Sequence, residues 1–223
     1  GTNFVAKNLP NALSVMAIAE KGNLLSAPDT YMEKISIGSN LPKNLLDLDN
    51  TIEKNIKLLA EAKNTIPEKL TACLLNRPRH KKIIDELNKL KVNINFITDG
   101  DVSGAMNVID ENSPVDIYLG IGGGPEGVLA AAALACYGGQ IQTRLVLNAE
   151  ERKRASKLGI KDFTKKYNID EIIKGDVMFV ATGITEGDLL SGISIEKHNF
   201  KASTLALHKS SNIQKKVTNI HKK

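Results

Sequence analysis

The chain has 223 residues, of which 42% are hydrophobic and 25% charged, so it can bury a proper core and hold one or two domains. It has no Trp and only 4% aromatic residues, which argues against a stacking surface for single-stranded nucleic acid. The net charge is +5, and much of the excess lies in 209–223, which we expect to be a solvated basic tail. The longest apolar stretches are too short to span a bilayer, so we expect neither a nucleic-acid nor a membrane partner.

Two cysteines lie in sequences that look buried: Cys73 in a strand-like run and Cys136 in an alanine-rich helix. They make no disulfide framework and fit a reducing, cytoplasmic setting. No signal peptide is visible, and the chain begins at Gly rather than Met. We therefore expect that something upstream has been removed.

The first 42 residues differ in pattern from the rest of the chain. Short strands are predicted at 12–19, 24–27 and 32–37, joined by Gly- and Pro-containing turns. This pattern resembles the end of a more antiparallel unit. We assign 1–42 to the remainder of an N-terminal α+β subdomain.

From residue 43 onward, predicted strands alternate with predicted helices. The strands are expected at 70–75, 92–97, 115–119 and 177–181, and the helices at 45–64, 80–90, 102–109, 125–137 and 150–158. Alternation of this kind predicts a mostly parallel sheet with helices on both faces. We assign 43–223 to a C-terminal α/β subdomain, in which helix 125–137 is apolar nearly all round and should be buried.

A glycine-rich stretch follows strand 115–119: residues 120–127 read Gly-Ile-Gly-Gly-Gly-Pro-Glu-Gly. A strand that ends in glycines before a helix is typical of an anion-binding loop with exposed backbone N–H groups. The stretch matches G-x-G-x-x-G, which is weak evidence alone, and the absence of a following Gly-Lys-Ser/Thr excludes a P-loop. Glu126 would repel a phosphate unless a cation lay between them, which favours metal-assisted phosphate chemistry. Alternatively, Glu126 is only a first-turn acid that complements the helix dipole.

Polar side chains follow the ends of four predicted strands, where open α/β sheets bind ligands. Arg77 and Arg79, spaced across Pro78, can present forked donors to a phosphate. Asp99 and Asp101 can accept from sugar hydroxyls or join a metal site. The other two ends lead into 120–127 and 182–188. Each residue also has an ordinary interpretation as a loop charge, turn or cap, but the four ends together favour a site.

Other catalytic arrangements find less support. The four histidines lack the spacing of zinc ligands, and no nucleophile-elbow sequence is present. We expect His80 to start a helix rather than to act as a general base.

These motifs resemble those of bacterial class II fructose-1,6-bisphosphatases, which belong to the metal-dependent, lithium-sensitive sugar and inositol phosphatases. The similar stretches occur in the family's order over nearly the whole chain: 27–34, 77–80, 99–101, 120–128 and 181–185. The resemblance implies a layered α/β/α/β/α fold with the N-terminal part of the first subdomain missing. It also implies hydrolysis of the 1-phosphate of fructose 1,6-bisphosphate with Mg²⁺ or Mn²⁺, a step of gluconeogenesis.

The resemblance assigns roles to individual positions. Glu126 matches a metal-ligating glutamate, and Gly123 matches a substrate contact. The positions that match those holding the sugar phosphate are Tyr31, Arg77, Pro78, Arg79, Asp99, Gly100 and Asp101.

Gly1 and Thr2 match the last two residues of the family's Asp-Pro-x-Glu-Gly-Thr motif. On this interpretation both contact substrate, and the Thr2 hydroxyl orients the attacking water. The alternative is that Gly1-Thr2 is a cloning remnant. The motif's own Asp and Glu, which are metal ligands in the family, have no counterpart here.

Glu126 alone cannot hold two cations, which need several carboxylates. We therefore expect the chain by itself to be inactive. Either the first part of the enzyme exists as a separate or disordered segment, or this chain is a cut piece of the enzyme. The expected partners are a sugar bisphosphate and further copies of the chain in a dimer or tetramer. Alternatives are a related sugar bisphosphatase such as one for sedoheptulose bisphosphate, a dinucleotide-binding module, and a non-catalytic subunit.

Overall fold

A computed structural model describes residues 2–222. Its larger sheet has six strands in the order β4 (Asn93–Ile97), β3 (Thr71–Leu75), β5 (Ile117–Gly123), β2 (Tyr31–Ile37), β6 (Gln140–Val146) and β7 (Lys166–Asn168). β3, β4, β5 and β6 run in one direction, as predicted for a mostly parallel sheet. β2, however, is inserted between β5 and β6 and pairs antiparallel with both, and β7 is antiparallel at the edge.

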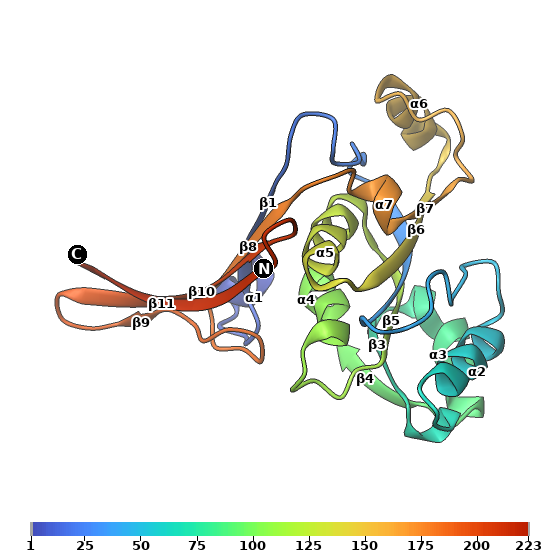
Figure 1. Cartoon of the computed structure of the whole chain (residues 1–223), viewed down its shortest axis with the longest axis horizontal. Coiled ribbons are helices and arrows are strands. Elements are labelled where there is room, and N and C mark those ends of the chain that lie inside the picture. The colour runs from blue at the N-terminus through green and yellow to red at the C-terminus, as the bar shows by residue number, and fades with distance from the viewer. Residues whose placement is uncertain (1, 223) are drawn as a thin grey trace.

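The second sheet is antiparallel throughout. It contains β1 (Leu13–Ile18), β8 (Met178–Gly183), β10 (Asn199–His208) and β11 (Ile213–Lys222), and the short β9 (Ser194–Ile195) pairs with β10. Two predictions are corrected here. β8 does not join the parallel sheet, and most of the predicted solvated tail is β11, the second strand of a long hairpin that projects from the body (Figure 1).

Helices separate the two sheets and cover the outer face of the six-stranded sheet. They are α1 (Thr2–Ala6), α2 (Ile52–Ala62), α3 (Lys81–Lys89), α4 (Asp101–Met106), α5 (Gly124–Tyr137), α6 (Ala149–Lys157) and α7 (Ile169–Ile172), with 3-10 turns at Pro67–Lys69, Pro78–His80 and Asn107–Ile109. α2 and α3 pack on one face of the six-stranded sheet. α5 lies between the two sheets, in the largest core cluster (Figure 1).

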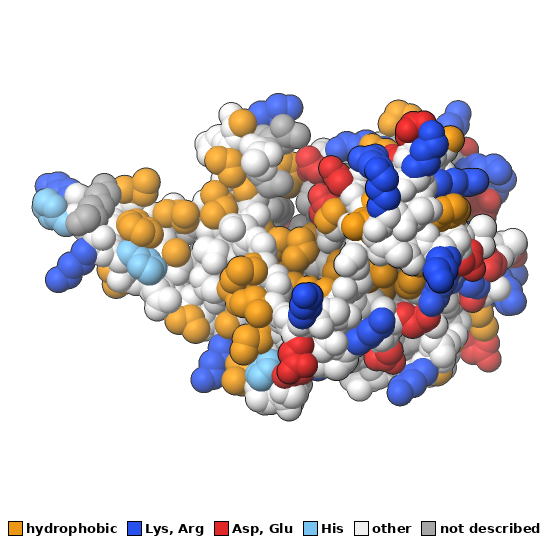
Figure 2. Space-filling model, turned by 90° about the horizontal axis from the view of Figure 1, so that it is seen from above, with side chains coloured by type: hydrophobic (Ala, Val, Ile, Leu, Met, Phe, Trp, Pro, Cys, Tyr) orange, Lys and Arg blue, Asp and Glu red, His pale blue; other side chains and the backbone are white. Residues whose placement is uncertain are grey.

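The α/β class is confirmed, and residues 2–222 form four layers in the order α/β/α/β. The predicted division at residue 42 does not follow the sheets, because β1 and β2 both precede it and lie in different sheets. Figure 2 shows charged side chains concentrated over the body and hydrophobic ones frequent on the projecting side. Exposed apolar residues there include Ile195, Val217 and Ile220.

Two further predictions fail locally. The helix expected at 45–64 begins only at Ile52, because Thr51 caps it by accepting from the Lys54 N–H. The preceding turn is held by the Asn55 side chain, which bonds both the N–H and the C=O of Asp47 at 3.1 and 2.8 Å. The strand expected at 24–27 is reduced to a single bridge between Leu24 and Ile173.

The two cysteines are buried and free, as the sequence predicts. Burial raises the pKa of Cys73 to about 12 and the pKa of Cys136 to about 11. Both thiols therefore stay protonated at neutral pH. Within 2–222, no helix has the length and apolar character needed to cross a membrane.

Candidate active site

A cavity of about 460 Å³ lies at the carboxyl edge of the six-stranded sheet. β3, β4 and β5 are parallel, so their last residues meet at this edge, and antiparallel β2 brings its first residue to the same place. Eight residues expected from the sequence line the cavity: Tyr31, Arg77, Arg79, Asp99, Gly100, Asp101, Gly123 and Glu126. Three of the four predicted strand ends therefore converge.

The other predicted positions are arranged differently. Pro78 is exposed between the two arginines and does not line the cavity. Thr2 is exposed at the start of α1, whereas Phe4, two residues further on, lines the cavity. Gly1 lies outside the described residues. The fourth strand end, at 182–188, belongs to the other sheet and contributes no residue to this cavity.

Arg79 is held in a defined orientation at the cavity. Its Nε and Nη2 donate to the Ile121 carbonyl at 2.9 and 2.7 Å, and its guanidinium lies 4.8 Å from the centre of the Tyr31 ring. The Nε–Nη2 edge of the guanidinium thus already donates to the backbone. The fork predicted for a phosphate is reduced to the Nη1–Nη2 end.

Sequence reasoning missed the role of His80, which is fully buried beside Arg79. The Ile121 N–H donates to Nε2 at 2.8 Å, so Nδ1 carries the proton and donates to the Leu75 carbonyl at 2.7 Å. Burial lowers the pKa of His80, which favours this neutral ring. The ring thereby joins the ends of β3 and β5.

The glycine-rich stretch does not form the predicted anion-binding loop. β5 continues through Gly123, with Gly122 opposite Met32 and Gly123 opposite Tyr31, and α5 begins at the next residue. A Cβ on Gly122 would overlap the Asp101 carboxylate, and one on Gly123 would overlap the Glu126 carboxylate. These glycines therefore make room for carboxylates, which removes the main support for a dinucleotide-binding module.

Asp101 sits in a buried polar network that the sequence did not reveal. Its carboxylate accepts from Lys34 Nζ on one oxygen and from the Tyr118 hydroxyl on the other. Burial raises the pKa of Asp101 and lowers the pKa of Lys34, because each charge loses contact with water. The only sequence signal was a lysine within the predicted strand 32–37.

Glu126 lies exposed in the first turn of α5 and lines the cavity. A carboxylate is a suitable oxygen ligand for Mg²⁺ or Mn²⁺. Among residues 2–222, however, no group of three or more His, Cys, Asp or Glu side chains is close enough to hold a metal ion. The described residues thus fit one ligand position of a metal site and not a whole site.

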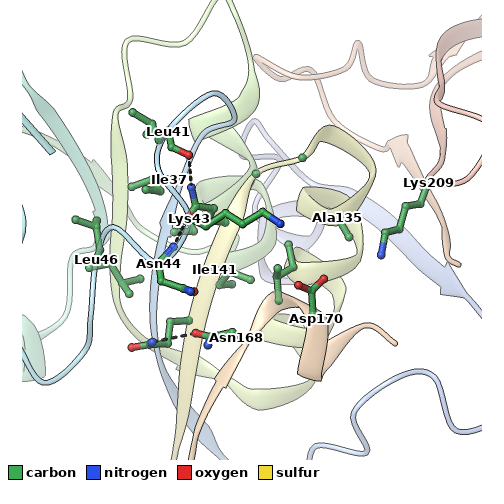
Figure 3. Close-up of a pocket in the computed structure, with 17 residues that line it drawn as sticks. Ile37, Leu41, Lys43, Asn44, Leu46, Ala135, Ile141, Asn168, Asp170 and Lys209 are labelled. Carbon is green, nitrogen blue, oxygen red and sulfur yellow. Dashed lines mark hydrogen bonds between the residues drawn. The ribbon is translucent and has the colours of Figure 1, made fainter. Parts of the chain in front are cut away.

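A second cavity, of about 340 Å³, lies away from these residues (Figure 3). The polar side chains that line it include Lys43 and Asn44 after β2, Gln140 and Gln142 of β6, Asn168 and Asp170 of β7 and α7, and Lys209 after β10. The Gln140 and Gln142 amides there already pair with neighbours, for example Gln142 with Asn168 at 2.9 Å. None of the described candidate site residues lines this cavity.

Comparison with known proteins gives consistent matches. The model of a family described as bacterial fructose-1,6-bisphosphatase, glpX-encoded, matches residues 1–221. The D-fructose 1,6-bisphosphatase class 2/sedoheptulose 1,7-bisphosphatase of Trichodesmium erythraeum is 33% identical over 235 residues, 99% of this chain and 68% of the relative. The protein of the same name from Synechocystis is 34% identical, over 100% of this chain and 68% of the relative. The fructose-1,6-bisphosphatase class 2 of Haemophilus influenzae is 36% identical, over 99% of this chain and 70% of the relative.

Proposed function

This chain belongs to the bacterial class II fructose-1,6-bisphosphatase family, whose members are phosphoric monoester hydrolases, and we propose that its cavity binds the sugar bisphosphate for that reaction. The observation that carries the proposal is the convergence of eight expected residues on one cavity. Two arginines in that lining match the charge of a phosphate, and Asp99 and the backbone at Gly100 match the hydroxyls of a sugar.

In the mechanism that we propose, water attacks phosphorus directly and no covalent enzyme intermediate forms. Arg79, fixed by Ile121 and Tyr31, anchors the phosphate that does not react. Asp99 and Gly100 orient the sugar, so that the reacting phosphate lies toward Glu126. Positioning and neutralisation of charge then supply most of the acceleration.

Glu126 is the residue of this cavity that would hold a cation, and we propose Mg²⁺ or Mn²⁺. When bound, such ions supply Lewis-acid polarisation of phosphate oxygens and a water of lowered pKa. Because one carboxylate cannot hold two ions, we propose that further carboxylates complete the site. The active enzyme is then this chain together with the polypeptide that supplies them.

Thr2 is proposed to orient the attacking water through its hydroxyl. Support comes from α1, whose Phe4 lines the cavity. A Cβ on Gly100 would also lie 3.6 Å from the Phe4 ring, so α1 lies beside the loop proposed to hold the sugar. Gly1 and Pro78 are proposed to contribute to substrate binding through the backbone.

The test is the change Arg79→Ala in the active enzyme. Loss of the anchoring contact should raise KM for fructose 1,6-bisphosphate by about tenfold or more, since charge-assisted bonds contribute about 1.5–3 kcal/mol. Arg152→Ala is the matched control, because Arg152 also lies over an aromatic ring, 5.8 Å from the centre of Phe163, and does not line the cavity. An unchanged KM in Arg79→Ala would contradict the proposed substrate site.

Sedoheptulose 1,7-bisphosphate is a second candidate substrate, because two of the relatives carry that activity in their names. Comparing kcat/KM for the two bisphosphates in the active enzyme decides between them. We further propose a cytoplasmic enzyme of gluconeogenesis that assembles as a dimer or tetramer. Gel filtration with light scattering measures the assembly.

A further inference from the structure

We propose that Lys34 is a positioning residue that ties the sugar-phosphate side of the cavity to the Glu126 side. The inference rests on the proposed function, because it assumes that these two sides bind substrate and metal. Lys34 does not line the cavity and lies beneath it, so it acts through its partners.

The ammonium group of Lys34 makes bonds to both sides. Lys34 is 1% exposed, and its Nζ donates to the Gly123 carbonyl at 2.7 Å and to the Asp101 carboxylate. Asp101 is the first residue of α4 and follows the Asp99-Gly100 turn. Gly123 is the last residue of β5, directly before the helix that carries Glu126. One buried cation therefore fixes the starts of two helices relative to each other.

The charges around Lys34 agree with this position between the two sides. Burial lowers the pKa of Lys34, the carboxylates of Asp101 and Glu126 act to raise it, and the guanidinium of Arg79 acts to lower it. The residues proposed to bind metal and phosphate are thus both close enough to act on the same ammonium group. Removing Lys34 would change the electrostatic environment of both.

The glycine-rich stretch is shaped to admit this network. A Cβ on Gly127 would lie 2.4 Å from Met32 Sδ and 2.7 Å from Lys34 Cε, and one on Gly122 would overlap the Asp101 carboxylate. A Cβ on Gly104 would lie 2.5 Å from Ile97 Cδ1 and 3.1 Å from the Tyr118 ring, whose hydroxyl bonds the same carboxylate. Gly122 and Gly127 thus leave space for Asp101 and Lys34, and both belong to the stretch that forms no phosphate loop.

The first experiment is Lys34→Met in the active enzyme, since Met keeps the length of the side chain and removes the charge and the donors. We expect two quantities to rise at least about tenfold: KM for fructose 1,6-bisphosphate and the Mn²⁺ concentration that half-saturates the enzyme. Electron paramagnetic resonance of free Mn²⁺ also measures the second quantity. Lys63→Met is the matched control: Lys63 forms an ion pair with Asp116, away from the cavity, and both quantities should stay within about twofold. A folded Lys34→Met enzyme with both quantities unchanged would overturn the proposal.

A second measurement avoids substitution, in case Lys34→Met does not fold. In protein labelled with ¹³C at lysine Cε, fructose 6-phosphate should shift the Lys34 signal and Mn²⁺ should broaden it, while the Lys63 signal responds to neither. A Lys34 signal that responds to neither ligand counts against the proposal. If Arg79→Ala raises KM and the Lys34 tests are negative, the positioning role alone fails. If Arg79→Ala also has no effect, the proposed substrate site itself is wrong.

Discussion

Among single residues, Glu126 carries two interpretations that one substitution separates. We expect Glu126→Gln to reduce kcat of the active enzyme by at least about 10³-fold with the fold intact, because it removes one anionic metal ligand and little volume. Steady-state kinetics and the urea midpoint measure the two effects. Glu150→Gln is the control, since Glu150 is another exposed acid in the first turn of a helix, α6. Full activity in Glu126→Gln would leave Glu126 only the role of complementing the helix dipole.

His80 gives a prediction about pH at the same scale. Burial lowers its pKa below 6.5 in the folded protein, so the unfolded chain takes up the proton first as pH falls. The stability that the neutral ring contributes is therefore fully present above about pH 6.5 and is lost as pH falls through the lower folded-state value.

Urea unfolding between pH 7.5 and 5 measures this loss, whose slope cannot exceed about 1.4 kcal/mol per pH unit for one proton. His80→Gln, which can bond the same two backbone groups without titrating, should flatten the profile. His198→Gln, at an exposed position, should not. Equal profiles for the original protein and His80→Gln would disprove the prediction.

At the scale of elements, α5 is the helix against which both sheets pack. Four consecutive alanines of this helix, Ala130 to Ala133, are all at most 1% exposed. A larger side chain at these positions would therefore overlap a neighbouring element. We expect Ala132→Leu to lower the free energy of unfolding by about 1–3 kcal/mol through overpacking. Ala149→Leu, at the exposed start of α6, should change it little. Denaturant unfolding measures both, and an unchanged midpoint in Ala132→Leu would mean that the two sheets can move apart.

For the whole molecule, the prediction concerns the phosphatase activity of this chain when it is assayed alone. It spans 68–70% of the length of the three relatives described above, and its cavity offers Glu126 as a metal-binding carboxylate. We expect no release of phosphate from fructose 1,6-bisphosphate with Mg²⁺ or Mn²⁺ when the chain is assayed alone, because two cations need several carboxylates. The active enzyme is the positive control. Turnover by the purified chain at the rate of the active enzyme would show that its own side chains complete the metal site.

The sequence was sufficient where local periodicity and burial agree. Apolar patterns predict helix 125–137, strand 70–75 and the buried cysteines, because such patterns indicate burial whichever element packs against them. It failed at 213–222, because every residue of this strand is exposed and the strand is held mainly by backbone bonds to β10, which leave no apolar period in the sequence. It also missed the insertion of β2 between β5 and β6, since pairing partners far apart along the chain are not encoded in either strand alone.

The same division holds at the site. The sequence by itself determined which residue types stand at the strand ends, and the parallel direction of β3, β4 and β5 then brings them to one cavity. Only the tertiary structure decided what Gly122 and Gly127 do, because the Asp101 carboxylate and the Lys34 side chain for which they leave space come from other segments of the chain. The glycines in the sequence indicate that the backbone can approach another group closely, and only the fold shows which group that is. Here that group is a buried Lys34–Asp101 pair, which fixes the geometry of the cavity from beneath.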